Sequence, residues 1–225
     1  LGAKRRCCRA REAGGLGNVV VEIFVLSSLG DPDGGTMCFL LVHGGFHGAW
    51  CWQRLIPELE RLGHDAVAID LPGHGTRRDE EVTVANRREA VLAAMEPGDV
   101  LVGHSGGGFE ITLAADAAPE QVGHLIYLAA VLPAAGRSLL EALNATTTTA
   151  GPPAADVTEA LSDAAHLHEF ARLNARGRLE CCDCAAVHGY FYHDVDEATA
   201  RWAYDRLTPA PLEFLTEPVS LPRFG

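Results

Sequence analysis

The chain has 225 residues, of which 48% are hydrophobic and 21% are charged, and its formal net charge is −12. This composition is typical of one soluble globular domain with a sizeable core and is too apolar for an intrinsically disordered chain. The acidic balance argues against nucleic acid or an anionic membrane surface as a partner, because both require basic patches. Glu22 interrupts the longest early apolar stretch, so no membrane-spanning segment is predicted.

The first 36 residues differ from the rest and are predicted to be a poorly structured extension, with at most a marginal strand at 19–26. A basic cluster, KRRCCRAR, precedes an apolar patch, as in a secretory signal. Glu22 lies inside that patch, however, and the cleavage region is poor, so export is the weaker alternative. The seven cysteines are odd in number and unevenly spaced, which favours reduced thiols and a cytoplasmic location.

Apolar runs alternate with segments of helical spacing between Met37 and Pro133. Strands are predicted at 37–43, 65–70, 100–103 and 124–133. Helices are predicted at 50–63, 84–95 and 108–118. This rhythm predicts the α/β class, with a mostly parallel sheet flanked by helices, and a core domain over residues 37–133.

The alternation of strand and helix patterns ends after Pro133. A Thr/Ala/Pro-rich stretch at 134–160 is typical of a linker, and helices are predicted at 159–176 and 196–207. No convincing buried strand is predicted among them, so residues 134–210 are expected to form a helical cap over the strand ends. Residues 211–225 would begin the return to the core.

Two glycine-rich loops, at 43–48 and 103–108, allow a nucleotide-binding interpretation. Asp70 ends the strand after the first loop, where an acid would hold a ribose hydroxyl. The spacing fails, because His43 stands where the first glycine of the dinucleotide fingerprint is required, and no acid closes the strand after the second loop. A dinucleotide fold is therefore disfavoured.

The second loop instead matches the nucleophile motif G-x-S-x-G, in Gly103-His104-Ser105-Gly106-Gly107. It lies between a predicted strand and a predicted helix, which is the context that this motif needs. Small residues must flank the sharp turn, and Gly103 and Gly107 meet that need. Ser105 is therefore the candidate nucleophile.

Acyl transfer also needs two hydrogen-bond donors for the developing oxyanion. One is expected to be the backbone N–H of Gly106, at the start of a helix. The other is expected from the loop HGGFHG, with Gly45 as first choice and Phe46 as second. His43 is expected to brace this loop rather than to transfer protons.

With FLLVHGGFHGAWCWQRL and VLVGHSGGGFEITLAA in view, the chain resembles the α/β-hydrolase superfamily, and within it the group of small esterases, plant methylesterases and hydroxynitrile lyases. The resemblance implies a serine hydrolase acting on a small apolar ester, a helical cap over an apolar pocket, and no metal or organic cofactor. It supports Ser105 as nucleophile and Gly45 and Gly106 as oxyanion donors. The elbow and its loop would be supported by His43, Gly44, Gly103, His104 and Gly107.

The sequence departs from the family at Gly106, where a large apolar residue is usual, and the departure would widen the pocket floor. The family's acid and histidine follow two further strands, so both are expected beyond Gly225 and are not assigned. Asp70 is implied to brace a loop. The other histidines considered are His74 on a loop and, in the cap, His166, His168, His188 and His193.

Other functions stay open within this fold. Hydroxynitrile lyase chemistry, C–C bond hydrolysis and amide hydrolysis are possible, as is a ligand-binding protein without turnover. The stretch from Cys181 to Cys184 is formally C-x-x-C with His188 nearby, but one pair and one histidine are a weak metal signal. No feature of the sequence indicates an oligomeric state.

Overall fold

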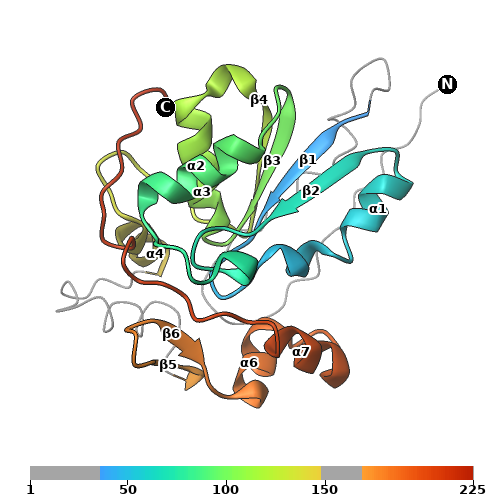
Figure 1. Cartoon of the computed structure of the whole chain (residues 1–225), viewed down its shortest axis with the longest axis vertical. Helices are drawn as coiled ribbons and strands as arrows, with labels where there is room; N and C mark the ends of the chain where they lie inside the picture. The colour runs from blue at the N-terminus through green and yellow to red at the C-terminus, as the bar shows by residue number, and fades with distance from the viewer. Residues whose placement is uncertain (1–35, 148–168, 225) are drawn as a thin grey trace.

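The computed structural model describes residues 36–147 and 169–224. Its central sheet contains β1 (Cys38–Val42), β2 (Asp65–Ile69), β3 (Asp99–His104) and β4 (Val122–Leu128). The four strands are parallel and lie in the order β2-β1-β3-β4 (Figure 1). The central strands β1 and β3 are the most buried, as their continuous apolar runs predict. The α/β class and the parallel sheet are thereby confirmed.

Helices cover both faces of the sheet. They are α1 (Ile56–Arg61), α2 (Val84–Ala94) and α3 (Gly107–Ala117), with the short 3-10 helices η2 (Ala49–Trp52), η3 (Gly75–Arg77) and η4 (Pro119–Gln121). Side chains alternate along β1, so that Leu40 packs with Ile111 of α3 while Phe39 packs with Trp52 and Leu59 on the other face. The result is a three-layer core with β1 and β3 at its centre.

Two predicted boundaries of this core are wrong. The helix expected at 50–63 is divided into η2 and α1, because Pro57 lacks an N–H and fits only the first turn of α1. The strand expected to reach Pro133 ends at Leu128, because Ala129 has a φ of 43° and turns the chain away from the sheet.

The segment expected to be linker also contains a helix, α4 (Leu139–Thr147). Its start is fixed by a reciprocal cap, in which Ser138 Oγ accepts from the N–H of Glu141 and Glu141 Oε2 accepts from the N–H of Ser138. The sequence signal was S-x-x-E, ahead of the Thr-rich stretch. Residues 148–168, which include about half of the expected linker and the first part of the helix expected at 159–176, lie outside the described residues, as does the strand expected at 19–26.

Beyond residue 168 the expectation of helix alone is wrong. An antiparallel hairpin is formed by β5 (Ala171–Leu173) and β6 (Leu179–Cys181), with Gly177 at a φ of 69° in the turn. The helices α6 (Cys184–Phe191) and α7 (Glu197–Tyr204) follow. We call residues 169–210 the cap segment.

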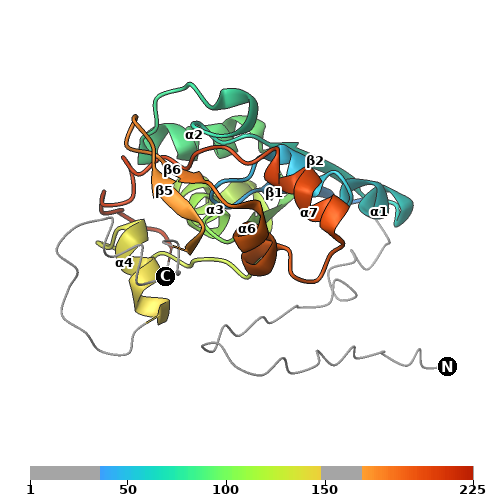
Figure 2. The ribbon, with the colours of Figure 1, turned by 90° about the horizontal axis from the view of Figure 1, so that it is seen from below.

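The cap segment lies against the loop that follows β1. Figure 2, seen from below, shows α6 and α7 crossing in front of the sheet. The N–H of Thr208 donates to the carbonyl of Phe46 at 2.8 Å, and Tyr192 and His47 are hydrogen-bonded at 2.7 Å. Residues far apart in the sequence thus meet at the carboxyl end of the sheet, where ligands bind in open α/β folds.

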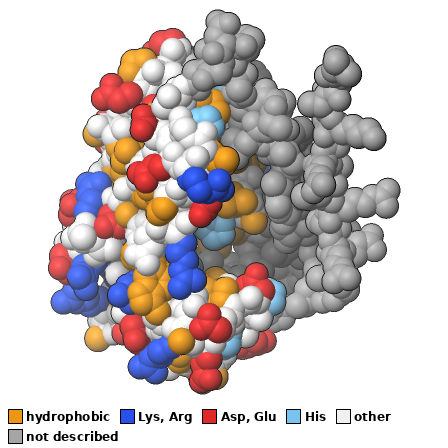
Figure 3. Space-filling view, turned by 90° about the vertical axis from the view of Figure 1, so that its right-hand side faces the viewer, with side chains coloured by type: hydrophobic (Ala, Val, Ile, Leu, Met, Phe, Trp, Pro, Cys, Tyr) orange, Lys and Arg blue, Asp and Glu red, His pale blue; other side chains and the backbone are white. Residues whose placement is uncertain are grey.

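Among the described residues visible in Figure 3, acidic and basic side chains are interspersed. Within residues 36–147 and 169–224, no helix combines the length and the apolar character needed to cross a membrane.

Candidate active site

Ser105 lies in the turn between β3 and α3, as the motif predicted. Its φ is 52°, a left-handed conformation that costs a non-glycine residue on the order of 1 kcal/mol. The turn is held from both sides, because the N–H of Ser105 donates to the carbonyl of Leu128 at 3.2 Å and its carbonyl accepts from the N–H of Val131 at 2.9 Å. Backbone strain that the surrounding hydrogen bonds maintain in this way clusters at active sites, where it positions a reactive side chain.

Glycines surround this turn because backbone segments meet there. A Cβ on Gly103 would lie 2.6 Å from the carbonyl carbon of Gly107, and one on Gly107 would lie 2.5 Å from the carbonyl oxygen of Val42. A Cβ on Gly44 would lie 2.8 Å from the Cβ of Ser105. These three glycines allow the loop after β1, the turn and α3 to approach one another.

Gly106 differs from its neighbours. A Cβ there would meet only the backbone nitrogen of Gly45, at 3.9 Å. The nitrogen of Gly45 thus lies close to Gly106, with one of these two residues on each loop. Gly106 also precedes the first residue of α3, at the positive end of the helix dipole.

His43 orients the peptide between Gly44 and Gly45. Burial lowers the pKa of His43 to about 3, so the ring is neutral. Its Nε2 lies 3.1 Å from the N–H of Leu71 and must accept, which leaves the proton on Nδ1 for the carbonyl of Gly44 at 2.7 Å. In a trans peptide the C=O and the following N–H point in opposite directions. The bond to Gly44 thus directs the N–H of Gly45 away from His43.

His47 is a candidate site residue that the sequence analysis did not single out. Its Nδ1 lies 2.8 Å from the carbonyl of Gly45, and its Nε2 lies 2.7 Å from the hydroxyl of Tyr192. Burial lowers the pKa of His47 to about 4. The signal in the sequence was the second histidine of HGGFHG, four residues after His43.

Phe46, between these groups, has a φ of 64°. Its carbonyl accepts from the backbone N–H of Thr208 at 2.8 Å, and its buried side chain packs near Phe170 and Phe191 of the cap segment. The loop after β1 is therefore a strained segment that both the core and the cap segment hold in place.

Acid is expected to destabilise the fold through the buried histidines. Burial lowers the pKa of His43, His47 and His74 below the ordinary value near 6.5. Below pH 6.5 the unfolded chain therefore binds protons that the folded chain does not, and the free energy of unfolding falls by about 1 kcal/mol per pH unit for each histidine. Urea unfolding at pH 7 and pH 5 measures this change.

The change should be smaller in His47→Asn, which removes one of the histidines whose pKa burial lowers. Equal unfolding midpoints at pH 7 and pH 5 would contradict this account of the histidines. The carboxyl group of Asp70 does not contribute between pH 7 and pH 5. Burial acts to raise its pKa, but the hydrogen bonds from Thr76 and Ala49 outweigh burial, and the pKa of Asp70 is lowered.

No histidine in the described part of the chain is hydrogen-bonded to the Ser105 side chain. His104 comes just before Ser105, but its half-buried ring packs edge-on against Trp52, and burial lowers its pKa. His188 bonds the carbonyl of Val195 through Nε2. His166 and His168 lie outside the described residues.

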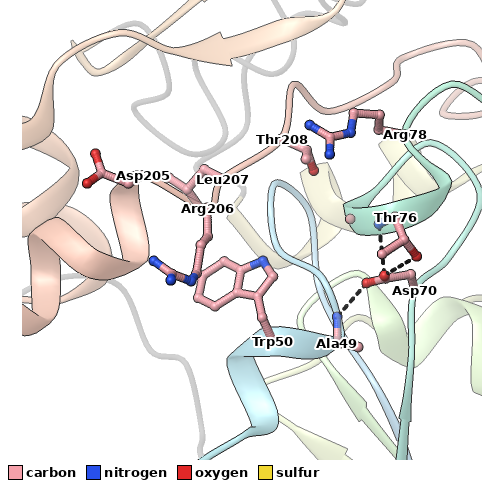
Figure 4. A pocket seen from close by; sticks show the side chains of 10 residues that line it. Ala49, Trp50, Asp70, Thr76, Arg78, Asp205, Arg206, Leu207 and Thr208 are labelled. Atoms are coloured by element: carbon pink, nitrogen blue, oxygen red, sulfur yellow. Dashed lines mark hydrogen bonds between the residues drawn. The ribbon is translucent and has the colours of Figure 1, made fainter.

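Asp70 binds backbone and hydroxyl groups rather than a histidine. Its Oδ1 accepts from the N–H of Ala49 at 2.7 Å, and its Oδ2 accepts from the N–H and hydroxyl of Thr76 at 2.9 and 2.7 Å. Figure 4 shows these bonds beside a groove of about 490 Å³ that also borders Trp50 and Thr208. Asp70 thus joins the start of η2 to η3.

A buried ion pair, which the sequence pattern does not reveal, links α2 to α3. Arg87 of α2 donates from Nε to Glu110 Oε1 of α3 at 2.6 Å, and both side chains are almost fully buried. Arg87 also contacts the carbonyl of Pro72 and the ring of Phe214. The pair ties α2, α3 and residues near the C-terminus together.

No cluster of three or more metal-ligating side chains is found in the described ranges. The Cys181–Cys184 stretch is divided between β6 and the start of α6, and the five cysteines of the described residues are free thiols.

Comparison with curated proteins finds esterases. The chain is 41% identical over 110 residues to the esterase PIR7B of Oryza sativa subsp. japonica, a match covering 45% of this chain and 41% of the relative. It is 39% identical over 104 residues to methylesterase 2 of Arabidopsis thaliana, covering 42% and 40%. The chain thus matches about two fifths of the length of these relatives.

Solved structures share the fold. Polyneuridine aldehyde esterase superposes with a TM-score of 0.67 and 24% identity, covering 83% of this chain and 74% of that one. The extracellular alpha/beta-hydrolase of a Paenibacillus species gives a TM-score of 0.64 and 23% identity, covering 84% and 72%. A family model described as the alpha/beta hydrolase family matches residues 39–224. The chain belongs to the alpha/beta hydrolase family.

Proposed function

We propose that the chain is the core and cap of a serine esterase in which Ser105 is the nucleophile. The observation that carries the proposal is the left-handed Ser105 at the turn between β3 and α3, next to the N–H groups of Gly45 and Gly106. The esterase names of the relatives in rice and Arabidopsis support the same reaction class.

In the proposed reaction, Ser105 Oγ attacks the carbonyl carbon of the ester and its proton passes to a general base. The carbonyl oxygen becomes an oxyanion, which accepts hydrogen bonds from the N–H groups of Gly45 and Gly106. The tetrahedral intermediate collapses, the alcohol leaves with a proton, and an acyl ester remains on Ser105. Water then attacks this ester and releases the acid.

We further propose that the base and its acid partner lie outside the described residues. This rests on the hydrogen bonds within residues 36–147 and 169–224, where the histidine contacts are to backbone carbonyls, backbone N–H groups, Tyr192 and Arg87. Serine without a base is a poor nucleophile at neutral pH. We therefore expect the described residues by themselves to support only slow turnover.

A small apolar ester is the proposed substrate. The cap segment presents aromatic rings to the loop after β1, where Phe46 lies 6.4 Å from Phe170 and 6.0 Å from Phe191, measured between ring centroids. A Cβ on Gly106 would meet no atom closer than 3.9 Å, so residue 106 itself does not fill the space beside the proposed oxyanion donors.

External imidazole should act as the general base for Ser105. Release of nitrophenolate from p-nitrophenyl acetate is expected to rise with imidazole concentration more steeply for the unaltered chain than for Ser105→Ala, which measures hydrolysis by imidazole alone. Equal slopes would contradict the role of Ser105. Rapid, saturable turnover without imidazole would leave the role of Ser105 intact and would show that a residue of this chain supplies the base.

A ligand-binding protein is the second candidate, favoured by the same lack of a histidine on Ser105 in the described residues. It predicts that a small ester binds with equal affinity to the unaltered chain and to Ser105→Ala and is recovered intact from both. Calorimetric titration followed by analysis of the bound ester separates the two functions.

A further inference from the structure

We propose that Tyr192 and His47 form a positioning pair through which the cap segment fixes the orientation of the loop that carries the N–H of Gly45. Tyr192 ends α6, and His47 lies on the loop after β1, 145 positions earlier in the sequence. The inference rests on the proposed function, since that loop supplies an oxyanion donor there.

Three consecutive carbonyls of this loop are each held by a named donor. The carbonyl of Gly44 accepts from His43, that of Gly45 from His47, and that of Phe46 from the backbone N–H of Thr208. Gly44 and Gly45 have no side chains with which to restrict their own backbone. The bond to the Gly44 carbonyl sets the direction of the Gly45 N–H, and the bonds to the carbonyls of Gly45 and Phe46 hold the two peptide planes that follow it.

The cap segment controls two of the three bonds. Thr208 follows α7 and acts directly, whereas Tyr192 acts through His47. Because the His47 ring is neutral and its Nδ1 carries the proton toward Gly45, Nε2 must accept, and the Tyr192 hydroxyl donates to it. Burial raises the pKa of Tyr192, which keeps the hydroxyl protonated for this purpose.

The hydroxyl can be separated from the packing of the ring. Tyr192 also packs its ring against His47 and Phe191, at 6.0 Å between centroids in each case. Tyr192→Phe keeps those contacts and removes only the bond to Nε2. Tyr190→Phe is the matched control, because Tyr190 lies on the same helix, packs against Phe170 and is 41% exposed.

A third variant, His47→Asn, tests whether Tyr192 acts on the Gly45 carbonyl through His47. In His47→Asn the side-chain amide nitrogen occupies the place of Nδ1 and can still donate to the carbonyl of Gly45. The asparagine side chain is too short to reach the hydroxyl of Tyr192. His47→Asn and Tyr192→Phe should therefore have the same effect, and the double variant should show no additional effect. A purely structural role for either residue predicts additive losses.

The test measures the loop without requiring activity. In ¹H–¹⁵N spectra of the full chain, Tyr192→Phe is expected to shift the amide resonances of Gly45 and Phe46, and to increase hydrogen exchange at those amides, while Tyr190→Phe leaves them unchanged. If Tyr192→Phe and Tyr190→Phe leave the Gly45 amide equally unperturbed, the inference is wrong.

The rate at which a fluorophosphonate modifies Ser105 in the presence of imidazole gives the functional measurement. Tyr192→Phe and His47→Asn should each slow it by about tenfold, less than the roughly 100-fold or greater loss expected when a whole oxyanion donor is removed. Normal modification in both variants overturns the inference and leaves the proposed function intact. If Ser105 is unmodified even in the unaltered chain, the proposed function fails, and the amide spectra still decide the inference.

Discussion

Gly107→Ala is expected to lower the free energy of unfolding by about 3 kcal/mol, enough to unfold much of a marginally stable domain. The added Cβ would lie 2.5 Å from the carbonyl oxygen of Val42 and 2.8 Å from that of His43. Both neighbours are backbone atoms of the chain leaving β1, so no side-chain rotation can relieve the contact. The loop after β1 and the start of α3 would have to separate.

Gly106→Ala, one residue earlier, is the matched control. The added Cβ would meet only the nitrogen of Gly45 at an ordinary contact distance of 3.9 Å. Its free energy of unfolding should stay within about 1 kcal/mol of the unaltered value. Urea unfolding followed by circular dichroism measures both variants. If Gly106→Ala and Gly107→Ala have equal free energies of unfolding, the close approach of β1 to α3 is not the reason for glycine at residue 107.

The central sheet and the turn at Ser105 could be predicted because local sequence specifies both. β1 and β3 are buried on both faces, so their residues are continuously apolar, and burial leaves little freedom to vary that pattern. The turn needs glycine where backbones meet, at Gly103 and Gly107, and this leaves a readable spacing around Ser105.

The boundaries that were wrong depended on single residues within an otherwise helical or apolar pattern. Pro57 divides the expected helix, and Ala129 ends β4 early by adopting a positive φ that no sequence rule assigns to alanine. The hairpin of β5 and β6 is only three residues per strand, too short for its period to be distinguished from that of a helix.

The parts of the site that were missed are contacts between distant segments. His47 meets Tyr192, and Arg87 meets Glu110, only because the fold brings their elements together. A single sequence shows a histidine and a tyrosine but not their approach. Backbone donors on the HGGFHG loop stay a prediction from the sequence, whereas the contacts that hold this loop are visible only in the structure.

Ser105→Ala is expected to abolish covalent modification by a fluorophosphonate. In that reaction Ser105 Oγ forms a bond to phosphorus, fluoride leaves, and the hydroxyl proton passes to the added imidazole. The strained turn that displays Ser105 and the nearby N–H groups of Gly45 and Gly106 should concentrate the reaction on this hydroxyl. Ser220→Ala, which removes an exposed serine remote from the turn in the sequence, should react like the unaltered chain.

Peptide mapping of the modified full chain by mass spectrometry therefore tests the central claim most directly. The account predicts one adduct, on the peptide that contains Ser105, present in the unaltered chain and in Ser220→Ala and absent from Ser105→Ala. Adducts on other residues alone, or the same extent of modification in Ser105→Ala, would contradict it.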